Sequence, residues 1–348
     1  MKPGMTILAC CAISLTLLAG CRVGDPAEGH SMVEVAPDET EYSALIDTIA
    51  YRSTPTRLLD VYPAQGENPS GIAIVFAHGG GWTGGSRTTA SEHPVFQFLL
   101  EEGHVGFSID YRLARIPGVT GQPLNCTQTE SPFPDNLDDV KWAIGWANKP
   151  ENKALYNYDR VVVVGESAGG HLAGLAAVTS DQRPAGIPAE YNIRPDAGVT
   201  IVAPLDMTTW GSQGEEGVQG FENIMARWAL IANKTDWANP LQCLFGSQYT
   251  TTSDVPISIR EAASASEHVD LGDPPIYMVS ATSDALAFTE FNADVLEQAY
   301  SELTRNGSSN GRAWNDQVER GHHFSGRTHT NAEVLSFFLR KVVNGDFD

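Results

Sequence analysis

The stretch VVVVGESAGGHLAG, from Val161 to Gly174, decides how this chain is interpreted. Its four valines are typical of a short strand buried on both faces, and residues 168–178 have the small, apolar composition of a buried helix. A Gly-x-Ser-x-Gly pattern between a strand and a helix predicts a sharp turn that exposes the serine hydroxyl. Gly165 and Gly169 leave room there for a close backbone approach. Ser167 is therefore a candidate nucleophile, and the alternative is a buried serine between packing glycines.

The rest of the chain alternates short apolar runs with helix-like segments. We predict strands at residues 48–52, 58–62, 72–77, 105–109, 161–164, 199–203 and 276–279. We predict helices at residues 137–147, 168–178, 288–303 and 332–343. This alternation is typical of an α/β fold with a mostly parallel central sheet and helices on both faces. Residues 207–273 are far longer than an ordinary connection, so we expect a small cap inserted after the sixth strand.

Length, composition and charge restrict the class of protein. The 348 residues can bury a large core, and 42% apolar with 19% charged residues is ordinary for a soluble globular enzyme. The formal net charge is −21. Because nucleic-acid binding requires a basic surface, we expect no nucleic-acid partner.

The N-terminus has the features of an export signal. Residues 1–20 contain Lys2 and a short apolar run, and they end in Leu-Ala-Gly before Cys21, which resembles a bacterial lipobox. We predict a lipoprotein signal peptide whose removal leaves a lipidated Cys21, so that the exported protein meets a membrane only through this anchor. The alternative is an ordinary secretory signal. Because Arg22 replaces the aspartate that signals inner-membrane retention, we expect an outer-membrane or periplasm-facing location.

Two further regions follow the signal. Residues 21–42 are polar and lack periodicity, which predicts a flexible tether. Residues 43–348 then form the predicted catalytic domain, with 207–273 as its cap.

A glycine-rich loop follows the predicted strand 72–77. Its sequence is HGGGW, from His78 to Trp82. Glycines allow backbone N–H groups to approach a reacting oxygen closely, as the oxyanion of acyl transfer requires. A flexible loop is the alternative, whereas a Walker-type phosphate loop is excluded because no Gly-Lys-Ser/Thr follows.

Together these motifs resemble a known fold. HGGGW, then Asp-Tyr-Arg-Leu at 110–113 and GESAGGHLA, are similar to the α/β-hydrolase fold, within the esterase/lipase group of hormone-sensitive-lipase-like and BD-FAE-like carboxylesterases. The resemblance covers about residues 45–345. It implies that the amides of Gly80, Gly81 and Ala168 form the oxyanion hole.

The base and the acid are expected after the serine, in the order Ser, Asp or Glu, His. The resemblance implies a Gly-His-x-Phe pattern around the base, which matches His322, with neighbouring His323 as the alternative. Asp284 follows the predicted strand 276–279 and is the preferred acid, with Asp206 as its rival. A metal site built on the paired histidines is disfavoured, because no cysteine or carboxylate cluster with ligand spacing accompanies them.

The resemblance implies a serine carboxylesterase acting on small acyl esters through an acyl-enzyme intermediate, with Ser167, His322 and Asp284 as the triad. No metal or organic cofactor is expected, and the expected partner is a small-molecule ester. Two alternatives stay open. One is an amidase or formamidase using the same triad, and the other is a non-catalytic binding protein of this fold.

Two cysteines of the predicted domain are candidates for a disulfide. Cys126 and Cys243 both lie in connections that leave the carboxyl edge of the predicted sheet. Two separate buried thiols are the alternative.

Asp110 and Arg112 are interpreted as structural, with an ion pair between them as the simplest arrangement.

Overall fold

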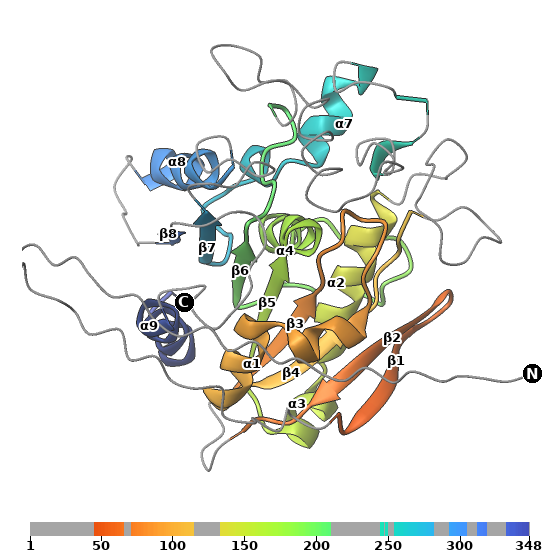
Figure 1. Cartoon of the computed structure of the whole chain (residues 1–348), viewed down its shortest axis with the longest axis vertical. Helices are drawn as coiled ribbons and strands as arrows, with labels where there is room; N and C mark the ends of the chain where they lie inside the picture. Colours follow the sequence, from red (N-terminus) through yellow and green to blue (C-terminus); the bar gives the residue numbers. More distant parts are fainter. Residues whose placement is uncertain are drawn as a thin grey trace, which may run out of the picture. The chain divides into compact units, whose positions relative to one another are not determined.

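An eight-stranded sheet forms the centre of the structure (Figure 1). The computed structural model describes residues 45–65, 71–114, 133–209, 244–246, 248–249, 254–281, 292–304, 312–318 and 332–347. The strands are β1 (Asp47–Ser53), β2 (Thr56–Tyr62), β3 (Ile72–Ala77), β4 (Val105–Ile109), β5 (Arg160–Glu166), β6 (Ala197–Ile201), β7 (Ile276–Ala281) and β8 (Ala313–Val318). Their order is β1-β2-β4-β3-β5-β6-β7-β8. β2 pairs antiparallel with β1 and β4, and every other pair is parallel.

Helices cover both faces of this sheet (Figure 1). α1 (Pro94–Glu101) and α9 (Ala332–Asn344) pack with one set of buried strand residues, and α2 (Asp135–Ala147), α4 (Ala168–Val178) and α8 (Ala293–Thr304) pack with the other. All 11 residues of α4 are buried, so this helix has no solvent face. The predicted α/β-hydrolase fold class, with its mostly parallel sheet between two helical layers, is confirmed.

The remaining described helices are shorter and lie in the connections. They are η1 (Arg87–Glu92), α3 (Pro150–Tyr156), α7 (Ile257–Ala262) and η4 (Ala265–Glu267). Among the described helices, none combines the length and the apolar character needed to cross a membrane.

Several predicted boundaries differ from the structure. The sixth strand ends at Ile201 and not at residue 203, because Val202 has a positive φ of 43° that extended backbone does not allow. α1, α3 and β8 were not among the predicted elements. The sequence does contain a signal for the start of α1, because Pro94 lies in its first turn. In the structure the side chain of His93 caps this helix by accepting a hydrogen bond from the backbone N–H of Phe96.

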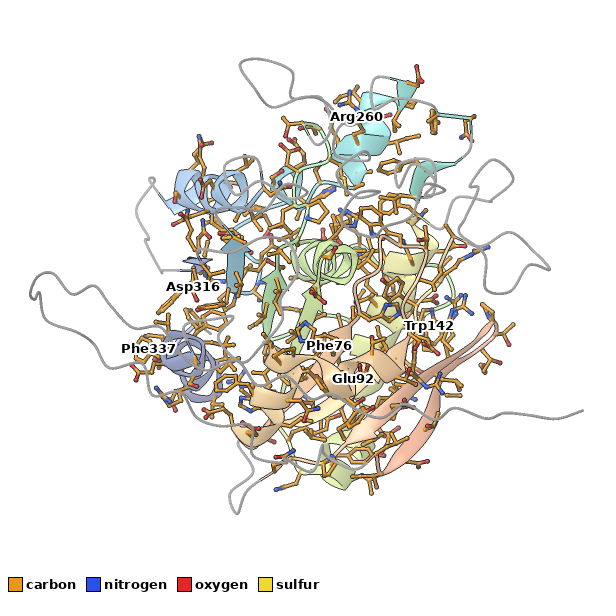
Figure 2. The ribbon with its side chains drawn as sticks, viewed as in Figure 1. Phe76, Glu92, Trp142, Arg260, Asp316 and Phe337 are labelled. Carbon is orange, nitrogen blue, oxygen red and sulfur yellow. The ribbon has the colours of Figure 1, made fainter. Side chains whose placement is uncertain are left out.

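The predicted cap is described only in part. α7 and η4 belong to the predicted insertion between β6 and β7, whereas residues 210–243 lie outside the described residues. Arg260 of α7 (Figure 2) donates from Nη1 to the carbonyl oxygen of Thr208 at 2.5 Å, which ties α7 to the chain that leaves β6. The cap itself stays a prediction, as do the signal peptide and the tether, which lie outside the described residues.

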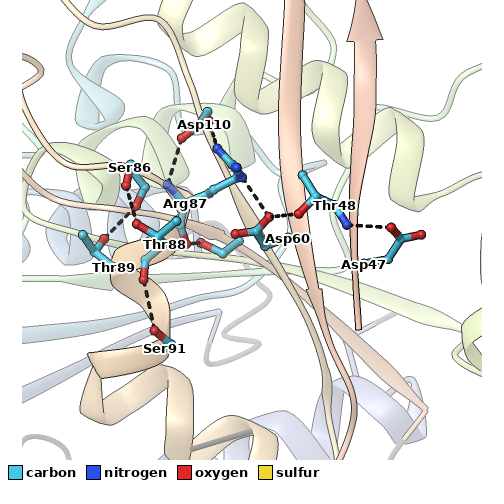
Figure 3. Close-up of polar contacts among 10 residues, drawn as sticks. Asp47, Thr48, Asp60, Ser86, Arg87, Thr88, Thr89, Ser91 and Asp110 are labelled. Atoms are coloured by element: carbon cyan, nitrogen blue, oxygen red, sulfur yellow. Dashed lines mark hydrogen bonds and ion pairs between the residues drawn. The ribbon is translucent and has the colours of Figure 1, made fainter. Parts of the chain in front are cut away.

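An ion-pair cluster holds η1 against the strands (Figure 3). Arg87 donates from Nη1 to Asp110 at 2.7 Å and from Nε to Asp60 at 2.8 Å. Asp60 also accepts from the hydroxyl of Thr48 at 2.7 Å. The expected pair between Asp110 and Arg112 is therefore wrong, because η1 places Arg87 closer to Asp110, and Arg112 pairs with an aspartate of α2.

Candidate active site

Ser167 occupies a strained turn between β5 and α4. β5 ends at Glu166 and α4 begins at Ala168, so a single residue makes the connection. Ser167 has φ 51° and ψ −118°, a conformation that costs a non-glycine residue free energy and persists only when its surroundings hold it. Its backbone N–H donates to the carbonyl oxygen of Ile201 at 2.8 Å. The predicted strand-turn-helix geometry around the serine is present.

The glycines of this turn are required by backbone contacts. A Cβ on Gly165 would lie 2.2 Å from the carbonyl oxygen of Gly169, and a Cβ on Gly169 would lie 2.1 Å from the carbonyl oxygen of Ala77. The first turn of α4 therefore packs directly on the ends of β5 and β3. A Cβ built on Gly79 would lie 3.5 Å from the Cβ of Ser167, so the HGGGW loop begins beside the candidate nucleophile.

The carbonyl of Gly80 sets the direction of one predicted oxyanion amide. It accepts hydrogen bonds from the backbone N–H groups of Thr83 at 3.1 Å and Gly84 at 3.0 Å, within the loop itself. In a trans peptide the C=O and the following N–H point in opposite directions. The N–H of Gly81 is therefore directed away from this turn. Gly80 has φ 120°, which favours glycine at this position.

The carbonyl of Gly79 sets the direction of a second amide by the same geometry. It accepts from Nδ1 of His78 at 2.7 Å, so the N–H of Gly80 points away from the His78 ring. His78 is itself fixed, because Tyr111 stacks on its ring and donates its hydroxyl hydrogen to the His78 carbonyl at 2.7 Å. Ala168 opens α4, where N–H groups have no acceptor within the helix. The oxyanion role of these three amides stays a prediction.

His171, one turn after the candidate nucleophile, bridges two parts of the chain. Its Nδ1 accepts from the indole N–H of Trp82 at 3.2 Å, and its Nε2 lies 2.7 Å from the carbonyl oxygen of Ala263, to which it donates. The side chain is buried, and burial lowers the pKa of His171 to about 4. It is neutral near pH 7, with its proton on Nε2. Sequence reasoning did not identify these two contacts, because both partners are distant along the chain.

A second polar pair lies next to the serine. Oε2 of Glu166 is 3.2 Å from Nε2 of His93, the residue that caps α1. The His93 ring packs at 5.0 Å on the ring of Phe76, an interior residue of β3 (Figure 2). The end of β5 therefore lies close to the residue that caps α1. Sequence reasoning did not identify this pair.

The carboxylate of Asp206, the alternative triad acid, accepts hydrogen bonds from its own loop. One carboxylate oxygen accepts from the backbone N–H of Thr208 at 2.8 Å, and the other accepts from the hydroxyl of Thr209 at 2.9 Å. The residue is 3% exposed. These contacts are those of a carboxylate that stabilises a loop.

The other predicted site residues lie outside the described part of the chain. They are Cys21, Cys126, Cys243, Asp284, His322 and His323. Among the residues that the structure describes, no cluster of His, Cys, Asp and Glu is arranged to hold a metal ion.

A cavity of about 660 Å³ lies beside the glycine loop. Its lining includes His78 from the loop, Gly85 beyond it, and the arginines Arg57, Arg87 and Arg112. Each of these guanidinium groups is paired with an aspartate. The arginine charges in the lining are therefore balanced by aspartates.

Comparison with known proteins gives a family and a set of relatives. The sequence matches the BD-FAE family over residues 59–297. It is 26% identical over 302 residues to esterase LipC of Mycobacterium tuberculosis, covering 84% of this chain and 64% of that protein. It is 30% identical over 172 residues to human hormone-sensitive lipase, covering 49% of this chain and 13% of the lipase. The chain therefore spans less than two thirds of the length of these relatives.

Solved structures show the same fold. A truncated carbohydrate esterase from gut microbiota superposes with a TM-score of 0.61 at 20% identity, covering 88% of this chain and 99% of that chain. Esterase 2 of Thermogutta terrifontis gives a TM-score of 0.57 at 20% identity, covering 88% of this chain and 97% of the other.

Proposed function

Because this chain belongs to the BD-FAE family, we propose that it is a carboxylesterase that hydrolyses small acyl esters with Ser167 as the nucleophile. The observation that carries the proposal is the strained turn that presents Ser167 beside the glycine loop. The N-terminus of α4 adds a positive dipole end where negative charge develops during acyl transfer. The esterase relatives support the same reaction class.

The proposed reaction uses two acyl transfers. Ser167 attacks the ester carbonyl while His322 takes its proton, and the resulting oxyanion is stabilised by the amides of Gly80, Gly81 and Ala168. The alkoxide leaves with the proton from His322, and an acyl-serine remains. Water then attacks the acyl-serine by the same route and releases the acid. Asp284 orients the imidazole and stabilises its positive charge.

The strand order supports this assignment of base and acid. Ser167 follows β5, Asp284 follows β7, and His322 follows β8, three parallel strands on one side of the sheet. Parallel strands end at the same edge, where ligands bind in open α/β sheets. Asn292, which follows the Asp284 segment, accepts a hydrogen bond from the N–H of Leu205 at 2.8 Å. Ala281 and Asn292, the described residues on either side of this segment, therefore lie near the carboxyl ends of β7 and β6.

The decisive experiment compares Ser167→Ala with the unchanged protein on p-nitrophenyl esters of increasing acyl length. We expect hydrolysis to be lost with the fold intact by circular dichroism, and the chain-length profile to give the size of the acyl pocket. Ser53→Ala, at an exposed serine at the end of β1, is the matched control and should retain full activity. Undiminished turnover by Ser167→Ala would refute the assignment.

The amidase and binding alternatives are tested with the same protein. Preferential hydrolysis of an N-formyl substrate over every ester would favour the formamidase-type reaction. A folded protein whose Ser167 is not labelled by a fluorophosphonate probe would favour a binding role. His322→Ala and His323→Ala, measured side by side, identify the base, and we expect only the first to abolish labelling.

Export as a lipoprotein is part of the proposal. Lipidation of Cys21 would hold the domain to a membrane through acyl chains. Cys21→Ser is expected to move the protein from the membrane to the soluble fraction. Membrane association that survives this substitution would overturn the lipid anchor.

We also propose a disulfide between Cys126 and Cys243. The support comes from described neighbours, because the N–H of Phe133 donates to the carbonyl oxygen of Leu244 at 3.4 Å and the rings of Phe133 and Phe245 are 6.0 Å apart. These contacts place Phe133, which lies after Cys126 in the chain, beside the two residues that follow Cys243. Intact-mass analysis with a thiol-alkylating reagent should show both cysteines blocked without reductant, and alkylation of both would overturn the disulfide.

A further inference from the structure

A side-chain hydrogen bond connects the glycine loop to α4. The indole N–H of Trp82 donates to Nδ1 of His171 at 3.2 Å, and the two rings meet edge to face at 5.4 Å between centroids. Both side chains are buried, at 2% and 0% exposure. The proposed reaction assigns no role to either residue.

The backbone of Trp82 is in a conformation that needs support. Its φ is 59°, in the left-handed region that favours glycine, and a bulky residue there costs free energy. The carbonyl of Trp82 accepts from the N–H of Ala114 at 2.9 Å, so the residue is held from its backbone as well as from its ring. Trp82 directly follows Gly81, and its own position therefore limits how far the Gly80 and Gly81 peptides can rotate.

The carbonyl of Ala263 fixes the tautomer of His171 whose Nδ1 can accept a hydrogen bond from Trp82. Nε2 lies 2.7 Å from that oxygen and must carry the proton, which leaves the lone pair of Nδ1 for the indole of Trp82. A protonated imidazole would present an N–H to the indole N–H and break the contact. No charged side chain contributes to the lowering of the His171 pKa, which has burial as its main cause.

We propose that His171 is a positioning residue for the oxyanion hole. By accepting from Trp82 it holds the amides of Gly80 and Gly81 in the direction that the developing oxyanion requires. The inference rests on the proposed esterase function and adds to it a requirement for a neutral acceptor at residue 171. The hydrogen bond from His171 to Ala263, between α7 and η4, also links the oxyanion hole to the insertion after β6.

Two substitutions separate the two hydrogen bonds of His171. In His171→Asn the side-chain oxygen is as many bonds from Cα as Nδ1 and can accept from Trp82. In His171→Gln the amide nitrogen is as many bonds from Cα as Nε2 and can donate to Ala263. Each variant thus keeps one hydrogen bond and loses the other, so their stabilities should fall by similar amounts.

Steady-state kinetics on p-nitrophenyl acetate, with thermal unfolding as the fold control, test the proposal. We expect His171→Gln to lower kcat about 10- to 100-fold with little change in KM, since outright removal of an oxyanion donor costs about 100- to 1,000-fold. His171→Asn should stay within about 5-fold of the unchanged protein, because its acceptor still holds the loop. Equal losses of kcat in the two variants would overturn the positioning role.

Substitutions of tryptophan keep the test decisive if a residue 171 variant does not fold. Trp82→Phe removes the indole donor and should reproduce the loss seen for His171→Gln, and the double variant should lose no more than either single one. Trp142→Phe, on α2 (Figure 2), is the matched control, because the indole nitrogen of Trp142 has no hydrogen-bond partner in the described part of the chain. Full activity of folded Trp82→Phe would refute the proposal.

Failure of the function and failure of the inference give different results. If the unchanged protein shows no Ser167-dependent ester hydrolysis, the esterase proposal fails and the positioning role with it. If hydrolysis depends on Ser167 while the losses in the Trp82 and His171 variants are additive, only the positioning role fails.

Discussion

Acidification should destabilise this protein through His171. Burial lowers the pKa of His171 from 6.5 to about 4, whereas in the unfolded chain the residue titrates near its ordinary value. Between these two values the unfolded state binds a proton that the folded state does not. The free energy of unfolding therefore falls as pH is lowered from about 6.5 towards 4, and this contribution is fully present only above that window.

The size of the effect follows from the shift in the pKa of His171. One pKa unit corresponds to about 1.4 kcal/mol, so a change from 6.5 to about 4 corresponds to about 3 kcal/mol over the whole window. Most of it, about 2–3 kcal/mol, is lost between pH 7 and pH 4.5. His104 and Asp273 also titrate in this range, because burial lowers the pKa of His104 to about 4 and raises the pKa of Asp273 to about 7.

The assay isolates His171 from these other groups. Urea unfolding of the unchanged protein and of His171→Asn is followed from pH 4.5 to pH 7.5, and the difference between the two stabilities is plotted against pH. His104 and Asp273 are present in both proteins and cancel. We expect the unchanged protein to be more stable than His171→Asn near pH 7. This difference in the free energy of unfolding should decrease by about 2–3 kcal/mol at pH 4.5. Two parallel stability curves would refute the reasoning.

Three further predictions concern the turn, a buried acid and the rival triad acid. In thermal unfolding, Gly169→Ala should lose about 2–3 kcal/mol of stability by overpacking, because its Cβ would lie 2.1 Å from a backbone carbonyl oxygen. Gly84→Ala is the control and should be tolerated, because the nearest atom to its Cβ would be 3.7 Å away. Asp273→Asn should stabilise the protein by ~1–2 kcal/mol at pH 8 and by little at pH 4. The pKa of the Asp273 carboxyl is raised in the folded protein, so the unchanged protein loses stability as pH rises towards 7. Equal effects at both pH values would contradict this reasoning. Asp206→Asn should lower the unfolding midpoint and leave fluorophosphonate labelling nearly unchanged, whereas Asp284→Asn should slow labelling more than ~100-fold, and the reverse pattern would exchange their roles.

Features fixed by neighbouring residues could be predicted from the sequence. The turn at Ser167 needs only a strand, two glycines and a helix in succession, so its local pattern was sufficient. The glycine loop after β3 was predictable for the same reason, and the parallel pairing of β3 with β5 brings it to the serine.

Features that depend on distant contacts were missed. His171 contacts Trp82 and Ala263 only once the sheet, α4 and η4 have packed together. The sequence around His171 therefore does not predict these partners. The assignment of Arg112 to Asp110 failed because proximity in sequence was taken for proximity in space. Arg87 reaches Asp110 because η1 folds back over the carboxyl end of β4.

The complete burial of α4 has a consequence for protein engineering. A helix without a solvent face offers no position where a side chain can change size freely, because interiors are packed close to crystal density. Ser167 and the helix behind it therefore form a fixed frame, and libraries intended to change substrate preference should leave residues 168–178 untouched. Diversity is better placed outside this helix, for example at Arg57 and Arg112 beside the glycine loop, which keep partial solvent exposure.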